Sequence, residues 1–492
     1  MHSEMTRRSL LRRAVAAGSL AGIGGASPLV GWAIAPGPGA SREGETERQE
    51  GGALALARLL NRARYEDLPP LAVEYAKMMV ASTLASAANG SRIDSARILR
   101  ELAIERGGRP EAAIWFDGTR LPAREAARVN AVQSDAAACD DSDLRNVAHC
   151  GTALTAAGLS LAGRTGATPR ELLLAMVVGY EAAGRIGEAR AGGRGGVHAS
   201  QIVAFGAAAA SGRLLGLTDE EMAHALGITA VTQGGLSIGT NSWAREYMAG
   251  NAAACGVDAA LAASRGFVVN GDLLDPARGF AGVYGGGDAE SLTREVEEWD
   301  IVRYLAVKLW PGAHPFSGTV EAAVNAAREA DVRPDEVQEI LVSGRNRTSV
   351  GGSRRPRDLI EAIHSLPYFV ASAVADQDFS WIHATPEKIF SPAAEQLMAV
   401  VQLDPSPPSV QYEWGWGGTV TIVTVGGERF TSTVDAPRGS APRGIEWSDV
   451  EAKYRALMPD SGLPPSRTEE VLSMIRDLDG LDSLPELTAL LA

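Results

Sequence analysis

The chain has little cysteine, few aromatic residues and a deficit of positive charge. Of its 492 residues, three are cysteines (Cys139, Cys150 and Cys255), 5% are aromatic, and 46 basic residues face 60 acidic ones. Three cysteines exclude a disulfide scaffold, and the absence of Cys-x-x-Cys spacing argues against a zinc ribbon or an iron–sulfur cluster. The net charge of −14 argues against nucleic acid or an anionic membrane surface as the main partner.

The composition nevertheless provides for a large hydrophobic core. Hydrophobic residues make up 45% of the chain, which excludes a disordered protein. With so few aromatics, this core must consist mainly of Ala, Leu, Val and Ile, and such a composition favours closely packed helices. At about 150 residues per domain the length predicts roughly three units, although one or two large units also fit.

The N-terminus has the features of an export signal. Thr6–Arg12 contains the pair Arg7-Arg8, and residues 14–35 carry no charge and are rich in Ala and Gly. We interpret residues 1–40 as a twin-arginine signal segment and residues 41–52 as a linker, so the expected location is periplasmic or extracellular. The apolar stretch is too weakly hydrophobic for a stable membrane span. The alternative is an N-terminal tail with two adjacent arginines by chance.

Residues 53–301 are predicted to form a helical domain. Apolar residues recur at helical spacing in 53–64 and 69–89. Two capping boxes, Thr168 with Glu171 and Thr218 with Glu221, mark the starts of further helices. Small-residue helices are expected at 205–215 and 250–264, and a turn with extended flanks at 114–120.

The pattern changes after residue 302. Residues 337–342, 420–425 and 429–434 are rich in β-forming residues, and Gly426-Gly427 predicts a hairpin between the last two. Helices are expected near 317–330, 365–376 and 393–401, so residues 302–444 are predicted to be an α+β domain. A third capping box, Ser448 with Glu451, predicts a helix that opens a C-terminal helical segment, 445–492.

A series of motifs in collinear order resembles the MmgE/PrpD family. The resemblance covers about residues 53 to 490 and rests on the series as a whole. Its motifs are Asp140-Asp141-Ser142 followed by His149, Glu171 to Glu181, Gly196-Val197-His198 followed by Phe205-Gly206, Leu226-Gly227-Ile228, Gly250-Asn251-Ala252-Ala253, Ser365-Leu366-Pro367-Tyr368, and Pro437 to Ser440.

The resemblance implies a fold and a type of chemistry. The fold would be mainly α, a large all-helical domain with a smaller α+β lid, usually in a homodimer. Activities in the family include dehydration of 2-methylcitrate, decarboxylation of cis-aconitate and epimerisation of iminodisuccinate, so the expected substrate is a small di- or tricarboxylate. No metal and no organic cofactor is expected.

Such reactions remove a weakly acidic proton next to a carboxylate, or form an equivalent carbanion. A positioned base contributes a factor of roughly 10²–10⁴, and cationic groups must stabilise the charge that develops. His149 and His198 match family site motifs and titrate near working pH, so we predict that they transfer protons. Asp140 and Asp141 are predicted to orient a histidine or bind a hydroxyl. The alternatives are ordinary hydrogen-bonding histidines and solvated acids.

Four further residues are predicted to bind substrate: Arg245, Ser142, His314 and Ser317. Arg245 stands where the family has a lysine, and an arginine can hold a carboxylate with two hydrogen bonds but cannot act as a base. Ser142 replaces the motif threonine. Ser317 aligns with a family histidine, for which His314 is a possible substitute.

Other departures affect the expected reaction. Ala138 occupies the position of the first motif aspartate, Met248 replaces a histidine, and there is one extra residue between Ser142 and His149. We therefore expect a cofactor-independent, dehydratase-like lyase, with an isomerase or epimerase, a decarboxylase, and a non-catalytic anion-binding protein as alternatives. A purely structural oligomer is the weakest reading.

Overall fold

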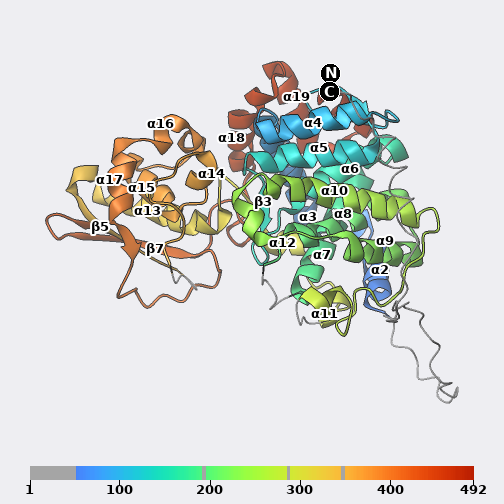
Figure 1. Cartoon of the computed structure of the whole chain (residues 1–492), viewed down its shortest axis with the longest axis horizontal. Helices are drawn as coiled ribbons and strands as arrows, with labels where there is room; N and C mark the ends of the chain where they lie inside the picture. The colour runs from blue at the N-terminus through green and yellow to red at the C-terminus, as the bar shows by residue number, and fades with distance from the viewer. Residues whose placement is uncertain (1–50, 191–195, 285–288, 345–348) are drawn as a thin grey trace, which may run out of the picture. The chain divides into compact units, whose positions relative to one another are not determined.

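Figure 1 shows the computed structural model of the chain, which describes residues 51–190, 196–284, 289–344 and 349–492. The predicted export signal and nearly all of the predicted linker lie outside the described residues. Within the described ranges, no helix is both long enough and apolar enough to cross a membrane.

Most of the described residues between 51 and 300 are helical, as predicted. The long helices are α2 (Gly52–Arg62), α3 (Pro70–Gly90), α4 (Asp94–Arg106), α5 (Ala123–Ala136), α6 (Cys150–Thr165), α7 (Pro169–Ala189), α8 (Ser200–Leu215), α9 (Asp219–Thr232) and α10 (Ala244–Ala263), followed by the short α11 (Phe280–Tyr284) and α12 (Asp300–Tyr304). The capping boxes at Thr168 and Thr218 are both formed.

Small residues allow these helices to pack closely. Helix α8 packs against α7 and α10, and α5 packs against α3 and α10 (Figure 1). A Cβ atom at Gly206 of α8 would lie 2.7 Å from the backbone oxygen of Gly179 in α7, so only glycine permits this approach.

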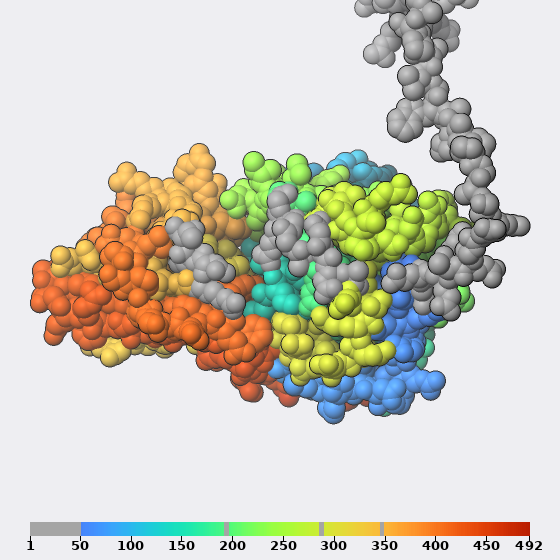
Figure 2. Space-filling view, turned by 90° about the horizontal axis from the view of Figure 1, so that it is seen from below, coloured from blue at the N-terminus to red at the C-terminus, as the bar shows by residue number. Residues whose placement is uncertain are grey.

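Helix α2 is held by residues that come much later in the chain. The backbone N–H of Gly52 donates to Asp275 Oδ1 at 3.0 Å, 223 positions further on, and Arg62 pairs with Glu295 at 3.2 Å. On the face shown in Figure 2, the blue N-terminal residues accordingly lie beside yellow-green residues of this later segment.

The α+β part contains one four-stranded sheet with its own hydrophobic core. Its strands β5 (Val337–Gly344), β6 (Val401–Leu403), β7 (Gly418–Thr424) and β8 (Arg429–Val434) lie in the order β6-β5-β7-β8, and only β5 and β6 are parallel. Helix α13 (Ser317–Ala330) packs on β7 and β8, and α15 (Leu366–Asp376) and α17 (Pro392–Val400) pack against each other beside it (Figure 1). The predicted hairpin at Gly426-Gly427 is confirmed.

The C-terminal helices join the first core. Helices α18 (Trp447–Leu457), α19 (Pro465–Arg476) and α20 (Leu484–Leu490) bury Val450, Tyr454 and Leu472 in the same hydrophobic cluster as the N-terminal helices. By their contacts, residues 50–492 form one compact unit, so the domain limits drawn from the sequence stay a prediction.

The capping box predicted at Ser448 is wrong. Helix α18 begins one residue earlier, at Trp447, and its N-cap residue Glu446 makes no side-chain capping bond. The Glu451 carboxylate, which a capping box would need, is instead paired with Arg455 and Arg476.

Three-residue strands that the sequence did not reveal connect the helical part to the α+β part. Strand β3 (Asp141–Asp143) pairs antiparallel with β4 (Leu305–Val307), with Asp141 opposite Val307. The predicted turn at 114–120 also forms, between β1 (Ala112–Ala113) and β2 (Arg120–Leu121). The β3–β4 pair carries the Asp140-Asp141-Ser142 motif, and β4 leads directly into Lys308.

Candidate functional site

A strained turn delivers the acid motif into the interior. Helix α5 ends at Ala136, and Ala138 has a positive φ of 52°, an unfavourable backbone conformation for alanine. The N–H of Gly312 donates to the Ala138 oxygen at 2.9 Å and holds this turn against the segment after β4. Asp140 and Asp141, which follow, are completely buried.

Asp140 is surrounded by donors. Lys308 Nζ lies 2.5 Å from its Oδ1, while Thr152 Oγ1 and His149 Nδ1 lie 3.3 Å and 3.1 Å from its Oδ2. Burial raises the pKa of Asp140, but the charges of His149 and Lys308 outweigh burial and hold the pKa well below its ordinary value. Asp140 is therefore an anion at neutral pH, and Lys308 is a member of the site to which the sequence analysis assigned no role.

Asp141 differs from Asp140 in its hydrogen-bond partners and in the direction of its pKa shift. Its Oδ2 accepts a hydrogen bond from the N–H of Gly151 at 2.9 Å, near the start of α6, and its Oδ1 has no hydrogen-bond partner among the described residues. Burial, reinforced by the neighbouring Asp140 charge, raises the pKa of Asp141 to about 6. A Cβ atom at Gly151 would lie 2.7 Å from Asp141 Oδ1 and 2.6 Å from Met79 Cγ, so this contact requires glycine.

His149 is oriented by the backbone of the same motif. It is the N-cap residue of α6, and its Nδ1 lies 2.6 Å from the Asp141 carbonyl oxygen. Because a carbonyl oxygen only accepts, Nδ1 carries the hydrogen, so Nε2 is the nitrogen that can take up or give the second proton. Ser142 Oγ lies 3.4 Å from the same Nδ1, so Ser142 sits beside the histidine as a buried neighbour.

His198 is the opposite tautomer. The backbone N–H of Ser200 points at His198 Nδ1, 3.1 Å away, and because an N–H only donates, Nδ1 must accept and Nε2 must carry the hydrogen. Burial, helped by His149, lowers the pKa of His198 to about 4. At neutral pH this ring is therefore an uncharged donor.

The two histidines line one cavity. Its free volume is about 10 Å³, about the room of one water molecule, and it is bounded on its polar side by His149, His198, Asp135, Thr152 and Ser200. The remaining lining is apolar, from Ala153, Val203, Ala249 and Ala252. The two histidines are groups that a proton-transfer reaction needs, and a substrate larger than water must widen the cavity to reach both of them.

Arg245 is bound to Asp135, one of the residues that line this cavity. Its Nε donates to Asp135 Oδ2 at 2.8 Å, and its Nη2 donates to the Asp135 backbone oxygen at 2.7 Å. Its side chain is buried, and Glu246 Oε1 lies 3.6 Å away. The structure thus brings Arg245 close to both histidines, but these two nitrogens already bind the protein, and substrate binding by Arg245 stays a prediction.

The α+β part contributes further histidines. His314 is buried against Trp416, with ring centroids 4.8 Å apart, and within the part of the chain that the structure describes its Nδ1 has no hydrogen-bond partner. Ser317 is the buried first residue of α13. Neither is among the residues that line the cavity, so their binding roles stay predictions.

His364, which the sequence analysis did not consider, also faces the cluster. Its Nδ1 lies 2.8 Å from the Ile360 carbonyl oxygen, and burial lowers its pKa to about 4, with smaller contributions from the charges of Arg245 and Lys308. Only its place directly before the Ser365 motif pointed to it in the sequence.

Three of these residues have a spacing that suits a metal ion. Asp135, Asp140 and His149 each place one ligand atom within 4.8 Å of the others. Both carboxylates already have a cation, Arg245 on Asp135 and Lys308 on Asp140. A metal ion would have to compete with a guanidinium and an ammonium group for these oxygens.

The cysteines take no part in a disulfide. Cys139 and Cys150 are both buried, and neither forms a disulfide. Burial raises the pKa of the Cys139 thiol to about 12, and Cys139 Sγ donates to the Ala137 oxygen at 3.1 Å. Both thiols therefore act as packing groups.

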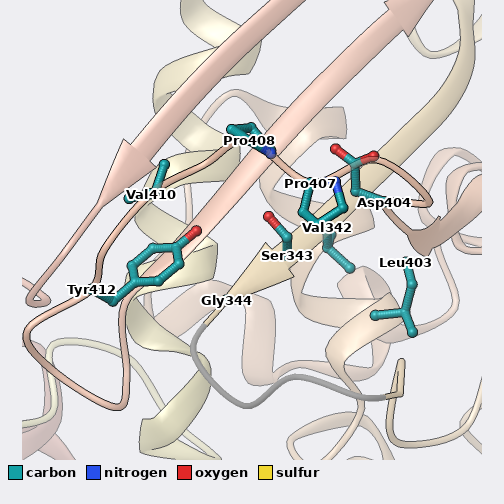
Figure 3. A pocket seen from close by; sticks show the side chains of 9 residues that line it. All are labelled: Val342, Ser343, Gly344, Leu403, Asp404, Pro407, Pro408, Val410 and Tyr412. Carbon is teal, nitrogen blue, oxygen red and sulfur yellow. The ribbon is translucent and has the colours of Figure 1, made fainter.

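A second hollow lies at one end of the four-stranded sheet. Its free volume is about 300 Å³, and it is lined by Val342, Ser343, Gly344, Leu403, Asp404, Pro407, Pro408, Val410 and Tyr412 (Figure 3). Its charged lining residue is Asp404, and none of these residues is basic. This hollow is therefore poorly suited to a carboxylate ligand, in contrast to the cavity beside His149.

Comparisons with known proteins agree with this architecture. Human cis-aconitate decarboxylase is 24% identical over 437 residues, which cover 85% of this chain and 90% of the human protein. The Aspergillus terreus protein of the same name is 25% identical over 464 residues, covering 87% of this chain and 93% of the fungal protein. The MmgE/PrpD N-terminal domain matches residues 54–292 and the MmgE/PrpD C-terminal domain matches residues 310–479. The chain therefore belongs to the MmgE/PrpD family.

Proposed function

We propose that the protein is a lyase that acts next to a carboxylate of a small di- or tricarboxylic acid, by dehydration in the first instance. The observation that carries the proposal is the pair of opposite histidine tautomers on one cavity. His149 is fixed with its hydrogen on Nδ1, which leaves Nε2 as the nitrogen that can take a proton, and His198 is fixed with a hydrogen on Nε2. A β-elimination needs one group of each kind.

The proposed steps follow from that division. His149 Nε2 takes the proton from the carbon next to the substrate carboxylate. The electron pair of the broken C–H bond forms the new double bond as the adjacent C–OH bond breaks, and His198 Nε2–H gives its proton to the leaving hydroxyl, which departs as water. Negative charge that develops on the carboxylate is stabilised by the nearby cations Arg245 and Lys308.

Decarboxylation is the second candidate, because the human and fungal relatives are named cis-aconitate decarboxylases and match nearly full length. Loss of CO₂ leaves an electron pair on carbon that only needs a proton donor, and His198 provides one. In that reaction the His149 free electron pair has no required role.

Both candidates are tested with one set of variants. The full chain is incubated with hydroxy-tricarboxylates and with cis-aconitate in deuterated water, and alkene formation, CO₂ release and deuterium incorporation are measured. His149→Gln should reduce dehydration by roughly 10²–10⁴-fold, as loss of a general base does. The control is His224→Gln, since His224 lies on α9 outside the cavity. Equal activity of His149→Gln and wild type would refute the assignment.

The other outcomes separate the remaining classes. Deuterium exchange without net elimination would identify an isomerase or epimerase. Binding of an acid without any turnover would identify a non-catalytic member of the family. CO₂ release that depends on His198 and not on His149 would favour the decarboxylase.

We also propose that two copies of the chain pair through an exposed apolar surface at the start of α10. Ile238 is 89% exposed and Leu236 66%, and Trp243 and Tyr247 next to them are about half exposed, which is unusual for such large apolar groups. Sedimentation velocity of the wild type and of Ile238→Glu tests this. A wild-type monomer, or an unchanged dimer in the variant, would count against this surface.

Twin-arginine export is likewise proposed on the sequence alone. Replacing Arg7 and Arg8 by lysines should retain the protein inside the cell, as cell fractionation would show. Export that is unchanged by the double replacement would refute the proposal.

A further inference from the structure

Lys453, in the middle of α18, has surroundings that are unusual for a lysine. Its side chain is 1% exposed, and its Nζ donates to Ser82 Oγ at 2.6 Å and to the Cys139 carbonyl oxygen. The ring of Trp381, from the α+β part, lies 5.7 Å from the same nitrogen. Among the residues that the structure describes, no carboxylate lies within 4.0 Å of it. Burying an ammonium group without a carboxylate is costly, so a compensating role is expected.

The other lysines of the chain show the contrast. Only four of the 46 basic residues are lysines, and the remaining three each have an acid: Lys77 with Glu74, Lys308 with Asp140, and Lys388 with Asp376. Lys453 alone among the four has neutral oxygen partners.

Lys453 also holds the acid motif in place. The carbonyl oxygen that it binds belongs to Cys139, between the strained Ala138 and the buried anion Asp140. Gly312 holds the same turn from the other side through the Ala138 oxygen. Strained backbone persists where its surroundings fix it, and here two donors do so.

The charges of the acidic and basic side chains at the site give Lys453 a second role. Asp135 is paired with Arg245 and Asp140 with Lys308, while Asp141, with its pKa of about 6, carries a third negative charge at pH 7 and above. Lys453 is the cation that offsets this third charge, so without it a polycarboxylate entering a chain of net charge −14 would meet a site that is itself negative.

We propose that Lys453 is a positioning residue which fixes the Asp140 turn and supplies the positive charge that keeps the site from repelling a polycarboxylate. The inference rests on the proposed function. Lys453 acts through the motif, since its nitrogen touches Cys139 and Ser82 and does not line the cavity.

The role should be visible in the pH dependence of binding. Burial lowers the pKa of Lys453 to about 8. The titratable and charged groups that face it are Cys139, Asp140, Asp141, Lys308 and His314. The thiol has a pKa near 12 and the acids titrate at about 6 or below, so between pH 7 and 9.5 Lys453 is the group expected to lose its charge. The affinity for an anion should then fall as the pH rises through 8.

The experiment uses the unreactive acid tricarballylate and calorimetry on the full chain, from about pH 7 to about pH 9.5. The wild type should lose roughly tenfold in affinity over this range, the order expected for the loss of one charge that acts through protein of effective dielectric constant about 20. Lys453→Met should bind about tenfold more weakly at pH 7 and show no step near pH 8. Lys453→Gln, which keeps a hydrogen-bond donor but not the charge, should show the same flat profile with a smaller loss of stability.

The controls separate the two levels of inference. Lys388→Met removes a partly exposed lysine that is paired with Asp376, and should retain the wild-type profile. If the wild type binds no tricarballylate at any pH, the proposed function fails. If it binds with a flat profile, or if Lys453→Gln keeps the wild-type step, the inference about Lys453 is overturned while the proposed function stands. The wild-type profile decides the matter even if the variants do not fold.

Discussion

The pair Lys308–Asp140 gives the sharpest test of how this site is built. The two side chains are 4% and 1% exposed, and Nζ lies 2.5 Å from Oδ1. Lys308→Met keeps the length of the side chain and removes the charge, so Asp140 is left as a buried anion with only Thr152 and His149 to bind it. Removing one partner of a buried pair costs about 3–5 kcal/mol, so we expect a loss of this size in the free energy of unfolding at pH 7.

The dependence on pH follows from the sign of the Asp140 shift. In the wild type the pKa of Asp140 is depressed, so its ionised form contributes stability above the ordinary value of 3.8, and this is lost as the pH falls. In Lys308→Met the cation is gone and burial raises that pKa. The difference in stability between wild type and variant should therefore grow between about pH 4 and about pH 7.

Urea unfolding followed by circular dichroism measures both effects. The matched control is Arg97→Met, which breaks an exposed pair with Glu101 at 3.0 Å and should cost at most about 1 kcal/mol. The double variant Lys308→Met with Asp140→Asn should recover part of the loss, because no buried charge remains. A loss below about 1 kcal/mol in Lys308→Met, or one that does not change with pH, would refute the reasoning.

Three further outcomes are expected. Burial raises the pKa of Glu246 to about 7 from 4.5, so its contribution to stability is lost as the pH rises through 7. In the same urea assay, the free energy of unfolding of Glu246→Gln should gain up to about 3 kcal/mol over wild type between pH 5 and pH 8. Stability profiles of the two proteins that run parallel with pH would contradict this. Gly151→Ala should displace the Asp141 carboxyl and cost about 1–3 kcal/mol in thermal unfolding, whereas the alanine variant of the exposed loop residue Gly426 should change stability by less than about 0.5 kcal/mol. Turnover should survive prolonged dialysis against a chelator, since Asp135 and Asp140 are balanced by side-chain cations; loss that is restored by a divalent metal would show that they bind one.

The larger elements were accessible from the sequence because their signals are local. The capping boxes at Thr168 and Thr218 and the hairpin at Gly426-Gly427 depend on residues within a few positions of each other, and all three are present. The family resemblance gave the fold class for the same reason. Strands β3 and β4 were missed because three residues carry no periodic signal, and because each is stabilised by a partner more than 160 positions away.

The site was only partly predictable. His149 and His198 stood in recognisable motifs, and the structure places both on one cavity. Their tautomers depend on the Asp141 carbonyl oxygen and on the Ser200 N–H, which only the folded backbone shows. Lys453 had no local signal, since it comes from the last helical segment, 314 positions after the carbonyl group that it binds.

The pairing of β3 with β4 limits how this protein can be recombined with its relatives. The strand that carries Asp141 is hydrogen-bonded to the strand that opens the α+β part, and Gly312, a few residues on, fits only because it lacks a Cβ atom, which would lie 2.5 Å from the Ile363 oxygen. A chimera joined between residues 300 and 304 would combine a β3 strand from one parent with a β4 strand from the other. A graft of a foreign α+β part should therefore take residues 141–143 and 305–312 from the same parent. Exchanging only one of these two segments would displace Asp140 from Lys308.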